Sequence, residues 1–372
     1  MNTLKKYCED SVEKYSLPSL QVIVMHKGAE VFRYQHNCND NSMYIGYSST
    51  KPFIGVAVAK LIGEGRTTLD TPAYEYLPEM QYLRVFEKDT SGMIIGEKKL
   101  DENKPILIRH LVSMTSGVAD NVWTDYINSA IESGKKSTQD IVKAILRQPL
   151  SFEPGADYKY GLSLDVLAAV IEKITGQKLS KYLQEIIFTP LNMTDTSFHP
   201  SEEQKKRLLQ QYMWYGDGGY FYAIPNDNDL VFTDEYESGG AGAYFTGDDY
   251  IKFANVLANG GTGMLSRAEI DFMRTPLLSE QLRSRYRTLL GFPGYTYGAC
   301  VRVMDEPESC GFVTPKGEFG WQGKGGTYCS ISPELNTAIF AGIQICDYHP
   351  INIVMHNELR EKVYNAVLNG EL

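Results

Sequence analysis

The sequence predicts an α/β plus all-α protein, in which an antiparallel sheet built from the N- and C-terminal segments is flanked by helices. Strand patterns occur near both ends of the chain, whereas the middle has mostly helical periodicity. A chain of 372 residues is also long enough for two subdomains. We therefore expect an α/β domain of residues 1–70 and 240–372, interrupted by a mainly helical domain of residues 71–239.

The N-terminal segment predicts a helix followed by a hairpin. Residues 2–15 place apolar side chains on one side of a helix, and SLQVIVMHKGAEVFRYQHN alternates on both sides of a turn at Lys27 and Gly28. A central helix follows, within residues 44–65. Its alanines and Gly55 would let other backbones approach closely, as in a buried helix.

Later segments divide into helical, aromatic and strand-forming parts. Residues 69–80 resemble a loop, residues 105–117 predict a short helix, and helical periodicity continues to about residue 198. Residues 212–245 are dense in Tyr and Gly and predict a wall or lid over a pocket, and a helix starts at Thr246. Three strand patterns follow, YTYGACVRVM, GEFGWQGKGGTYCSIS and NTAIFAGIQICD, and an amphipathic helix closes the chain.

Composition excludes several classes of function. The net charge is −10 and no Lys/Arg cluster occurs, which argues against nucleic-acid binding. No apolar run reaches the length of a membrane span, and the N-terminus lacks the apolar run of a secretory signal, so we expect a cytoplasmic protein. The six cysteines form no C-x-x-C pair and the six histidines no H-E-x-x-H motif, so we expect free thiols, no metal site and no cofactor.

The central helix carries the first candidate for chemistry, Ser48 followed by Lys51. Residues three apart at a helix start share a face, and a neighbouring amine can take the proton of a serine hydroxyl and make it nucleophilic. The S-x-x-K spacing alone is weak, because Ser11 and Ser133 also begin such motifs, on what we interpret as solvated faces. Only Ser48 precedes an apolar helix; the alternative is a helix-capping serine beside a surface lysine.

Two further stretches complete the candidate site. In FEPGADYKYGLSLDVL a Pro-Gly turn delivers Tyr158 or Tyr160 just before a helix, and FGWQGKGGTYCSIS predicts a glycine-rich strand against which a substrate could lie. Simpler interpretations exist for this strand, with Trp321 as a core residue and Lys324 as a solvated charge. Cys329 is an alternative nucleophile, although no histidine signal accompanies it. The run of residues 239–242, GGAG, matches no phosphate-binding spacing.

The order of STKP, FEPG with a following tyrosine, and FGWQG resembles the serine β-lactamase-related hydrolases, the class C β-lactamase and penicillin-binding-protein superfamily. Connecting segments such as EGRTTLDTPAYEYLPE, IRHLVSMTSG and IIFTPLNMTDTSF resemble that family too. The likeness covers roughly residues 20 to 345, and the joint order is far more specific than any single motif. It implies a β-lactamase/transpeptidase-like fold.

The resemblance also implies roles for individual residues. Ser48 would be the acylated nucleophile, Lys51 would hold its proton network, and Tyr160 would shuttle the proton to the leaving group. Either Lys51 or Tyr160 could be the acylation base. The backbone N–H groups of Ser48 and of Lys324, just after Gly323, would form the oxyanion hole.

Two departures from the family pattern bear on the substrate. Leu162 replaces the asparagine of the Y-x-N motif, and Trp321 stands where β-lactamases and peptidases usually carry lysine or histidine. Loss of these polar groups, which help to hold β-lactams or peptides, makes the pocket resemble the carboxylesterase and acyltransferase branch. We therefore expect a hydrolase of small acyl esters, with Trp321, Gly323 and Leu162 binding substrate. The alternatives are a β-lactamase or D-amino-acid peptidase, and a ligand-binding or sensor protein without turnover.

Overall fold

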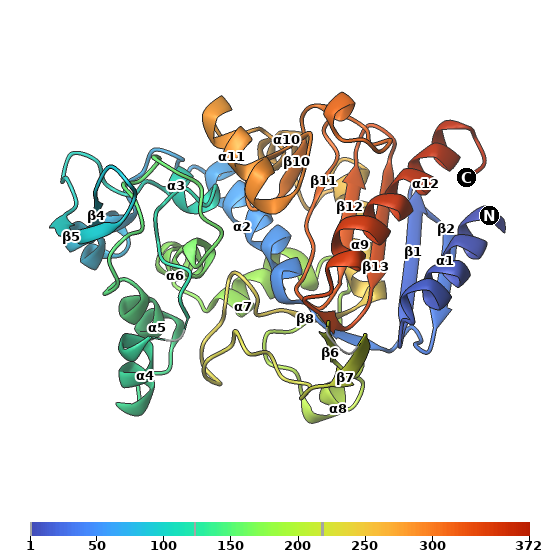
Figure 1. The fold of residues 1–372 in the computed structure, drawn as a ribbon, viewed down its shortest axis with the longest axis horizontal. Coiled ribbons are helices and arrows are strands. Elements are labelled where there is room, and N and C mark those ends of the chain that lie inside the picture. The colour runs from blue at the N-terminus through green and yellow to red at the C-terminus, as the bar shows by residue number, and fades with distance from the viewer. Residues whose placement is uncertain (1, 123, 217–218) are drawn as a thin grey trace.

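A seven-stranded antiparallel sheet dominates one end of the computed structural model, which describes residues 2–122, 124–216 and 219–372. Within these residues the strand order is β2-β1-β13-β12-β11-β10-β9. Both chain termini lie beside this sheet, and the hairpin of β4 Arg84–Lys88 and β5 Ile94–Lys99 lies at the opposite end of the molecule (Figure 1). The strands of the sheet are β1 Leu20–His26, β2 Ala29–His36, β9 Tyr295–Tyr297, β10 Arg302–Met304, β11 Phe319–Gly320, β12 Tyr328–Ser332 and β13 Thr337–Gly342.

The sheet joins the two ends of the chain, as predicted. Strand β1 pairs with β2 on one side and with β13 on the other, with Val22 opposite Ala341. The hairpin turn lies at Lys27 and Gly28, whose φ angles of 49° and 83° are those of a two-residue turn that matches the twist of the strands. The predicted fold class, with an antiparallel sheet of N- and C-terminal strands between helices, is confirmed.

Helices cover both faces of the sheet, because successive strand residues point to opposite sides. Val22 and Val24 of β1 pack in the same cluster as residues of the two terminal helices, α1 and α12. Ile23, between them, faces the other cluster, which contains residues of α9 and α2. The helices are α1 Asn2–Tyr15, α2 Lys51–Gly63, α3 Ile108–Val112, α4 Asp125–Glu132, α5 Thr138–Ile145, α6 Ser163–Thr175, α7 Leu179–Leu183, α8 Glu202–Lys205, α9 Gly247–Ala258, α10 Arg267–Met273, α11 Glu280–Leu290 and α12 His356–Leu368.

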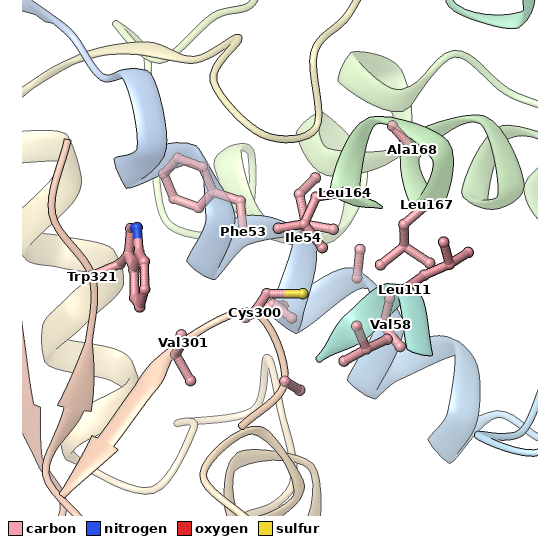
Figure 2. Close-up of a cluster of buried hydrophobic side chains, with 14 of the residues drawn as sticks. Phe53, Ile54, Val58, Leu111, Leu164, Leu167, Ala168, Cys300, Val301 and Trp321 are labelled. Atoms are coloured by element: carbon pink, nitrogen blue, oxygen red, sulfur yellow. The ribbon is translucent and has the colours of Figure 1, made fainter. Parts of the chain in front are cut away.

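The predicted buried helix, α2, lies between the sheet and the helical insertion. Figure 2 shows Phe53 and Ile54 of α2 among Leu164 of α6 and Cys300 of the β9–β10 connection. Gly55 permits this packing, since a Cβ there would lie 2.6 Å from the carbonyl oxygen of Ala299. One continuous apolar core therefore runs through both parts of the chain, and the division into domains at residues 71 and 239 stays a prediction.

Some secondary structure differs from the sequence prediction. The expected helical insertion contains the hairpin β4 Arg84–Lys88 and β5 Ile94–Lys99, and the aromatic segment forms β6 Tyr212–Tyr215 and β7 Tyr220–Ala223, which join β14 Ile345–Cys346. YTYGACVRVM is two strands and not one, because Gly298 donates its N–H to the carbonyl of Val301 in a tight turn. The glycine-rich strand ends at Gly320 and resumes at Tyr328, so the residues between form a loop.

Smaller predictions have mixed outcomes. Thr246 caps α9 as expected, its side chain accepting from the backbone N–H of Asp249. Ser11 is buried, so the interpretation of its S-x-x-K motif as a solvated face was wrong, whereas Ser133 is exposed. The six cysteines are unpaired thiols, as predicted. Among the helices of the described residues, none has the length and apolar character needed to cross a membrane.

Candidate active site

Ser48 lies at the start of the central helix, in the 3-10 turn Tyr47–Thr50 that leads into α2. The Nζ of Lys51 donates hydrogen bonds to the Oγ of Ser48 at 2.9 Å and to the carbonyl oxygen of Gly240 at 2.8 Å. Only 3% of Lys51 is exposed. The sequence alternative of a surface lysine beside a capping serine is therefore wrong, because this lysine is buried against the serine.

The backbone immediately before Ser48 is strained. Tyr47 has a φ of 45°, a conformation that costs a residue other than glycine about 1 to 3 kcal/mol unless its surroundings hold it. The Tyr47 hydroxyl donates to the Oε1 of Gln211 at 2.8 Å, and the N–H of Gly46 donates to the carbonyl of Ala243 at 2.9 Å. These contacts hold the turn that presents Ser48.

Tyr160 reaches the same serine from the segment before α6. Its hydroxyl donates to the Oγ of Ser48 at 2.7 Å, and its ring centroid lies 4.7 Å from the Nζ of Lys51. Trp321 stacks on the Tyr160 ring and donates its Nε1–H to the Tyr160 hydroxyl at 3.1 Å. The structure thus brings Ser48, Lys51, Tyr160 and Trp321 into one hydrogen-bonded cluster.

The rival candidates lie elsewhere. Tyr158 is buried against Tyr286 and Tyr297, and its hydroxyl has no hydrogen-bond partner among the described residues. Burial raises the pKa of the Tyr158 phenol well above its ordinary value, with a smaller contribution from Tyr286. Cys329 is fully buried in β12, where burial also raises the pKa of its thiol, so neither group is prepared to act as a nucleophile or base.

The loop after β11 packs directly against the turn that carries Ser48. A Cβ on Gly323 would lie 2.3 Å from the carbonyl oxygen of Gly46 and 2.5 Å from the Oγ1 of Thr327, so only glycine fits. Thr327 and Ser49 share a hydrogen bond of 2.8 Å between their hydroxyls. The loop after β11 is thus held against Gly46 and Ser49, the residues on either side of Tyr47 and Ser48.

Lys324 follows this contact and borders the same cavity as Ser48. Its backbone N–H forms no hydrogen bond within the part of the chain that the structure describes, as an oxyanion donor requires. Its side chain is not a free solvated charge, because Nζ donates to the Oδ2 of Asp229 at 2.7 Å. Burial would lower the pKa of the Lys324 ammonium, but pairing with Asp229 outweighs this effect and raises it.

Sequence analysis missed the support beneath Lys51. The buried carboxylate of Asp165, in α6, accepts hydrogen bonds from the hydroxyls of Tyr236 and Ser238, each at 2.6 Å. Ser238 in turn accepts from the N–H of Ala241, and the carbonyl oxygen of Gly240 accepts from Lys51. The GGAG run was the only sequence signal for this segment, and its glycines are required because Cβ atoms on residues 239 and 242 would collide with neighbouring groups.

Two cavities adjoin Ser48 and Tyr160. The smaller, about 160 Å³, includes Leu162 in its wall, and the larger, about 260 Å³, includes Trp321, Gly323 and Lys324. Leu162 and Trp321 are 8% and 3% exposed, so both are packed as well as cavity-lining. The second half of the aromatic segment does line the smaller cavity, through Leu230 and Phe232, as the prediction of a pocket wall required.

The fold and this cluster define a β-lactamase/transpeptidase-like protein, and comparison with known families agrees. The model of the Beta-lactamase family matches residues 4–343. The chain therefore belongs to the Beta-lactamase family, as its resemblance implied.

Individual relatives and solved structures are also similar to the chain. It is 27% identical to esterase EstB of Burkholderia gladioli, over 74% of this chain and 70% of that protein. It is also 27% identical to the lovastatin esterase of Penicillium rubens, over 77% and 73% of the two chains. The structure of simvastatin synthase LovD from Aspergillus terreus superposes with a TM-score of 0.80, covering 97% of each chain at 20% identity.

Proposed function

We propose that the protein is a serine hydrolase that forms an acyl-enzyme at Ser48 and acts as a carboxylesterase on small acyl esters. One observation carries this proposal: the Oγ of Ser48 accepts hydrogen bonds from both Lys51 Nζ, at 2.9 Å, and the Tyr160 hydroxyl, at 2.7 Å. A serine beside two groups that can exchange protons is the arrangement that nucleophilic catalysis needs.

The chemistry follows from these contacts. Whichever of Lys51 and Tyr160 is unprotonated accepts the Ser48 proton as Oγ bonds to the ester carbonyl carbon. The carbonyl oxygen becomes an oxyanion, which the N–H groups of Ser48 and Lys324 stabilise. The C–O bond to the alcohol then breaks, and Tyr160 protonates the departing oxygen. A water molecule then attacks the carbonyl carbon of the acyl-enzyme and gives a proton to the same base. The bond to Ser48 Oγ breaks and Oγ is reprotonated, which releases the carboxylic acid and restores Ser48.

Two side chains favour esters over β-lactams and peptides. Leu162 and Trp321 put a hydrocarbon group and an indole where the family usually has an amide and a cation. Among the charged groups near Ser48, Lys51 is engaged with Ser48 and Gly240, and Lys324 with Asp229. The site therefore offers a substrate carboxylate little charge to pair with. The names of the two esterase relatives support the same choice.

The test combines activity with covalent labelling. Wild-type protein, Ser48→Ala and Ser133→Ala are incubated with p-nitrophenyl esters, nitrocefin and a fluorophosphonate, and intact masses are recorded. Ser133 begins an S-x-x-K motif on the exposed end of α4, so its variant is a matched control. We expect ester turnover and one fluorophosphonate adduct for wild type and Ser133→Ala, and neither for Ser48→Ala.

Other outcomes select other functions. Nitrocefin cleavage faster than ester cleavage would favour a β-lactamase, and cleavage of D-alanyl peptides a D-amino-acid peptidase. A stable adduct at Ser48 without turnover of any substrate would indicate a ligand-binding or sensor protein. Ester turnover that survives in Ser48→Ala would contradict the proposed nucleophile.

A further inference from the structure

The two cavities beside Ser48 differ in size and in chemistry. Both have Ser48 and Tyr160 in their walls, so a molecule attacked by Ser48 can extend into both. An ester has two halves joined at the reacting carbonyl carbon, an acyl chain and an alcohol. If the protein is the esterase proposed above, each cavity can be matched to one half of the ester.

The smaller cavity suits a short hydrocarbon chain. Its wall contains the apolar side chains of Val122, Leu162, Leu230 and Phe232. The two carboxylates that also line it are already engaged, Asp120 with Lys159 and Asp165 with Tyr236 and Ser238. Its volume is about 160 Å³, close to the roughly 150 Å³ of an engineered apolar cavity that binds benzene. A chain of about six carbons would fill it, and a longer one would have to displace a packed side chain.

The larger cavity suits a polar, uncharged group. Its wall is mixed: Leu290, Phe292 and Ile353 contribute apolar surface, and Gln322, His349 and Asn352 contribute polar groups. The side chains of these three polar residues form no hydrogen bond with any other described residue. The Oδ1 of Asn352 is buried without a partner, which is unfavourable until a ligand or water provides one. The cation in this wall, Lys324, is already paired with Asp229. Hydroxyl groups, which both donate and accept, fit such a set of amides and imidazole.

The position of the Tyr160 hydroxyl indicates which cavity holds the acyl chain and which holds the alcohol. It lies between Ser48 Oγ and the Nε1 of Trp321, and Trp321 belongs to the wall of the larger cavity. The leaving oxygen must reach this hydroxyl to be protonated, so the alcohol departs through the larger cavity. The acyl chain then remains in the smaller one beside Leu162. We infer that the substrates are esters of short carboxylic acids, up to about six carbons, with uncharged polyhydroxy alcohols.

The acyl half is tested with p-nitrophenyl acetate, butyrate, hexanoate, octanoate and decanoate. We expect kcat/KM of wild type to fall at least tenfold between hexanoate and decanoate. Leu162→Ala should move this fall to longer chains by about two carbons, and Leu289→Ala, an exposed residue of α11, should leave the profile unchanged. Equal rates on butyrate and decanoate, or an unchanged profile in Leu162→Ala, would overturn the assignment of the smaller cavity.

The alcohol half is tested with glyceryl monobutyrate and n-propyl butyrate, which share the acyl chain and the three-carbon alcohol and differ by two hydroxyl groups. We expect wild type to favour the glyceryl ester at least fivefold in kcat/KM, about the effect of one hydrogen bond. Asn352→Leu, of similar shape, should bring this ratio close to one without reducing turnover of the propyl ester in proportion. Equal kcat/KM for both esters in wild type, or an unchanged ratio in the variant, would refute a hydroxyl-binding cavity.

These experiments distinguish a wrong proposed function from a wrong assignment of the cavities. If no ester is hydrolysed and no fluorophosphonate adduct forms at Ser48, the proposed function and this inference both fall. If esters are hydrolysed through Ser48 but neither chain length nor hydroxylation matters, only the assignment of the cavities falls.

Discussion

The indole Nε1–H of Trp321 donates a hydrogen bond to the hydroxyl oxygen of Tyr160 at 3.1 Å, and the two rings stack with centroids 5.7 Å apart. Trp321 is itself held by edge contacts with Phe292 and Tyr297. A donor fixed in this way stabilises negative charge that develops on the phenol oxygen during proton transfer, because a preorganised donor aimed at developing charge lowers the barrier. A neutral indole can thus support Tyr160.

Trp321→Phe should slow the reaction without unfolding the protein. Phenylalanine keeps an aromatic ring against Tyr160 but removes the N–H donor. A hydrogen bond to a charged group contributes about 1.5 to 3 kcal/mol, so kcat/KM for p-nitrophenyl butyrate should fall roughly 10- to 100-fold. Trp214→Phe, in the β6–β7 hairpin, is the matched control and should retain activity. An active Trp321→Phe enzyme with a lowered melting temperature would mean that the indole only packs.

Tyr160→Phe and Tyr158→Phe form a second matched pair, two residues apart. The Tyr160 variant loses the hydroxyl that contacts Ser48, and a general acid–base group contributes about 10² to 10⁴ in rate, so kcat should fall by that order. The Tyr158 variant removes a buried hydroxyl without a partner among the described residues, so its activity and stability should stay close to wild type. Steady-state kinetics and thermal unfolding check both. Similar losses in the two variants would argue against a special role for Tyr160.

Gly323→Ala should disturb the site through the backbone. The added Cβ would lie 2.3 Å from the carbonyl oxygen of Gly46, so the loop must move away from the turn that carries Ser48. The N–H groups of Ser48 and Lys324, which we propose as the oxyanion donors, would then separate, and loss of one such donor lowers kcat about 10²- to 10³-fold. Gly96→Ala is the control, because its Cβ would meet only a side-chain oxygen at 3.6 Å. Full kcat in Gly323→Ala would show that the loop is not needed in this position.

The sequence predicted the parts of the site that form locally and the family pattern that orders them. Ser48 and Lys51 are one helical turn apart, so their contact follows from spacing alone. The family resemblance already favoured Tyr160, but the local pattern left Tyr158 as a rival, because both follow the same Pro-Gly turn and only long-range packing distinguishes them.

Other features depended on contacts that no local pattern contains. Asp165 lies within the apolar run of α6, and its role appears only when the segment of residues 236–241 folds onto it. The loop after β11 was predicted as part of a glycine-rich strand. Instead of continuing the ladder, Gly323 donates its N–H to the carbonyl of Thr327, whose hydroxyl bonds to the Ser48 turn. The β4–β5 hairpin has an Asp-Thr-Ser-Gly turn that could have indicated it.

His356, at the start of α12, makes the stability of the protein sensitive to acid. It is fully buried and stacks on the ring of Tyr328, with centroids 4.5 Å apart. Burial, and to a lesser extent the charges of Arg302 and Arg360, lower its pKa to about 3, while a backbone contact with Gly326 opposes this shift. The imidazole is therefore neutral in the folded protein but takes up a proton in the unfolded chain below about pH 6.5.

Between pH 6.5 and pH 3 the unfolded state thus binds one more proton at this site than the folded state. Stability is fully present above pH 6.5 and falls by roughly 1.4 kcal/mol for each pH unit below it, so about 2 kcal/mol is lost by pH 5. Urea unfolding at pH 7.5, 6 and 5 measures this slope. His356→Phe, which keeps a ring against Tyr328, should lose about 2 kcal/mol less than wild type over this range. The exposed His349→Leu should keep the wild-type slope. If His356→Phe and wild type lose stability in parallel, the buried imidazole does not control acid sensitivity.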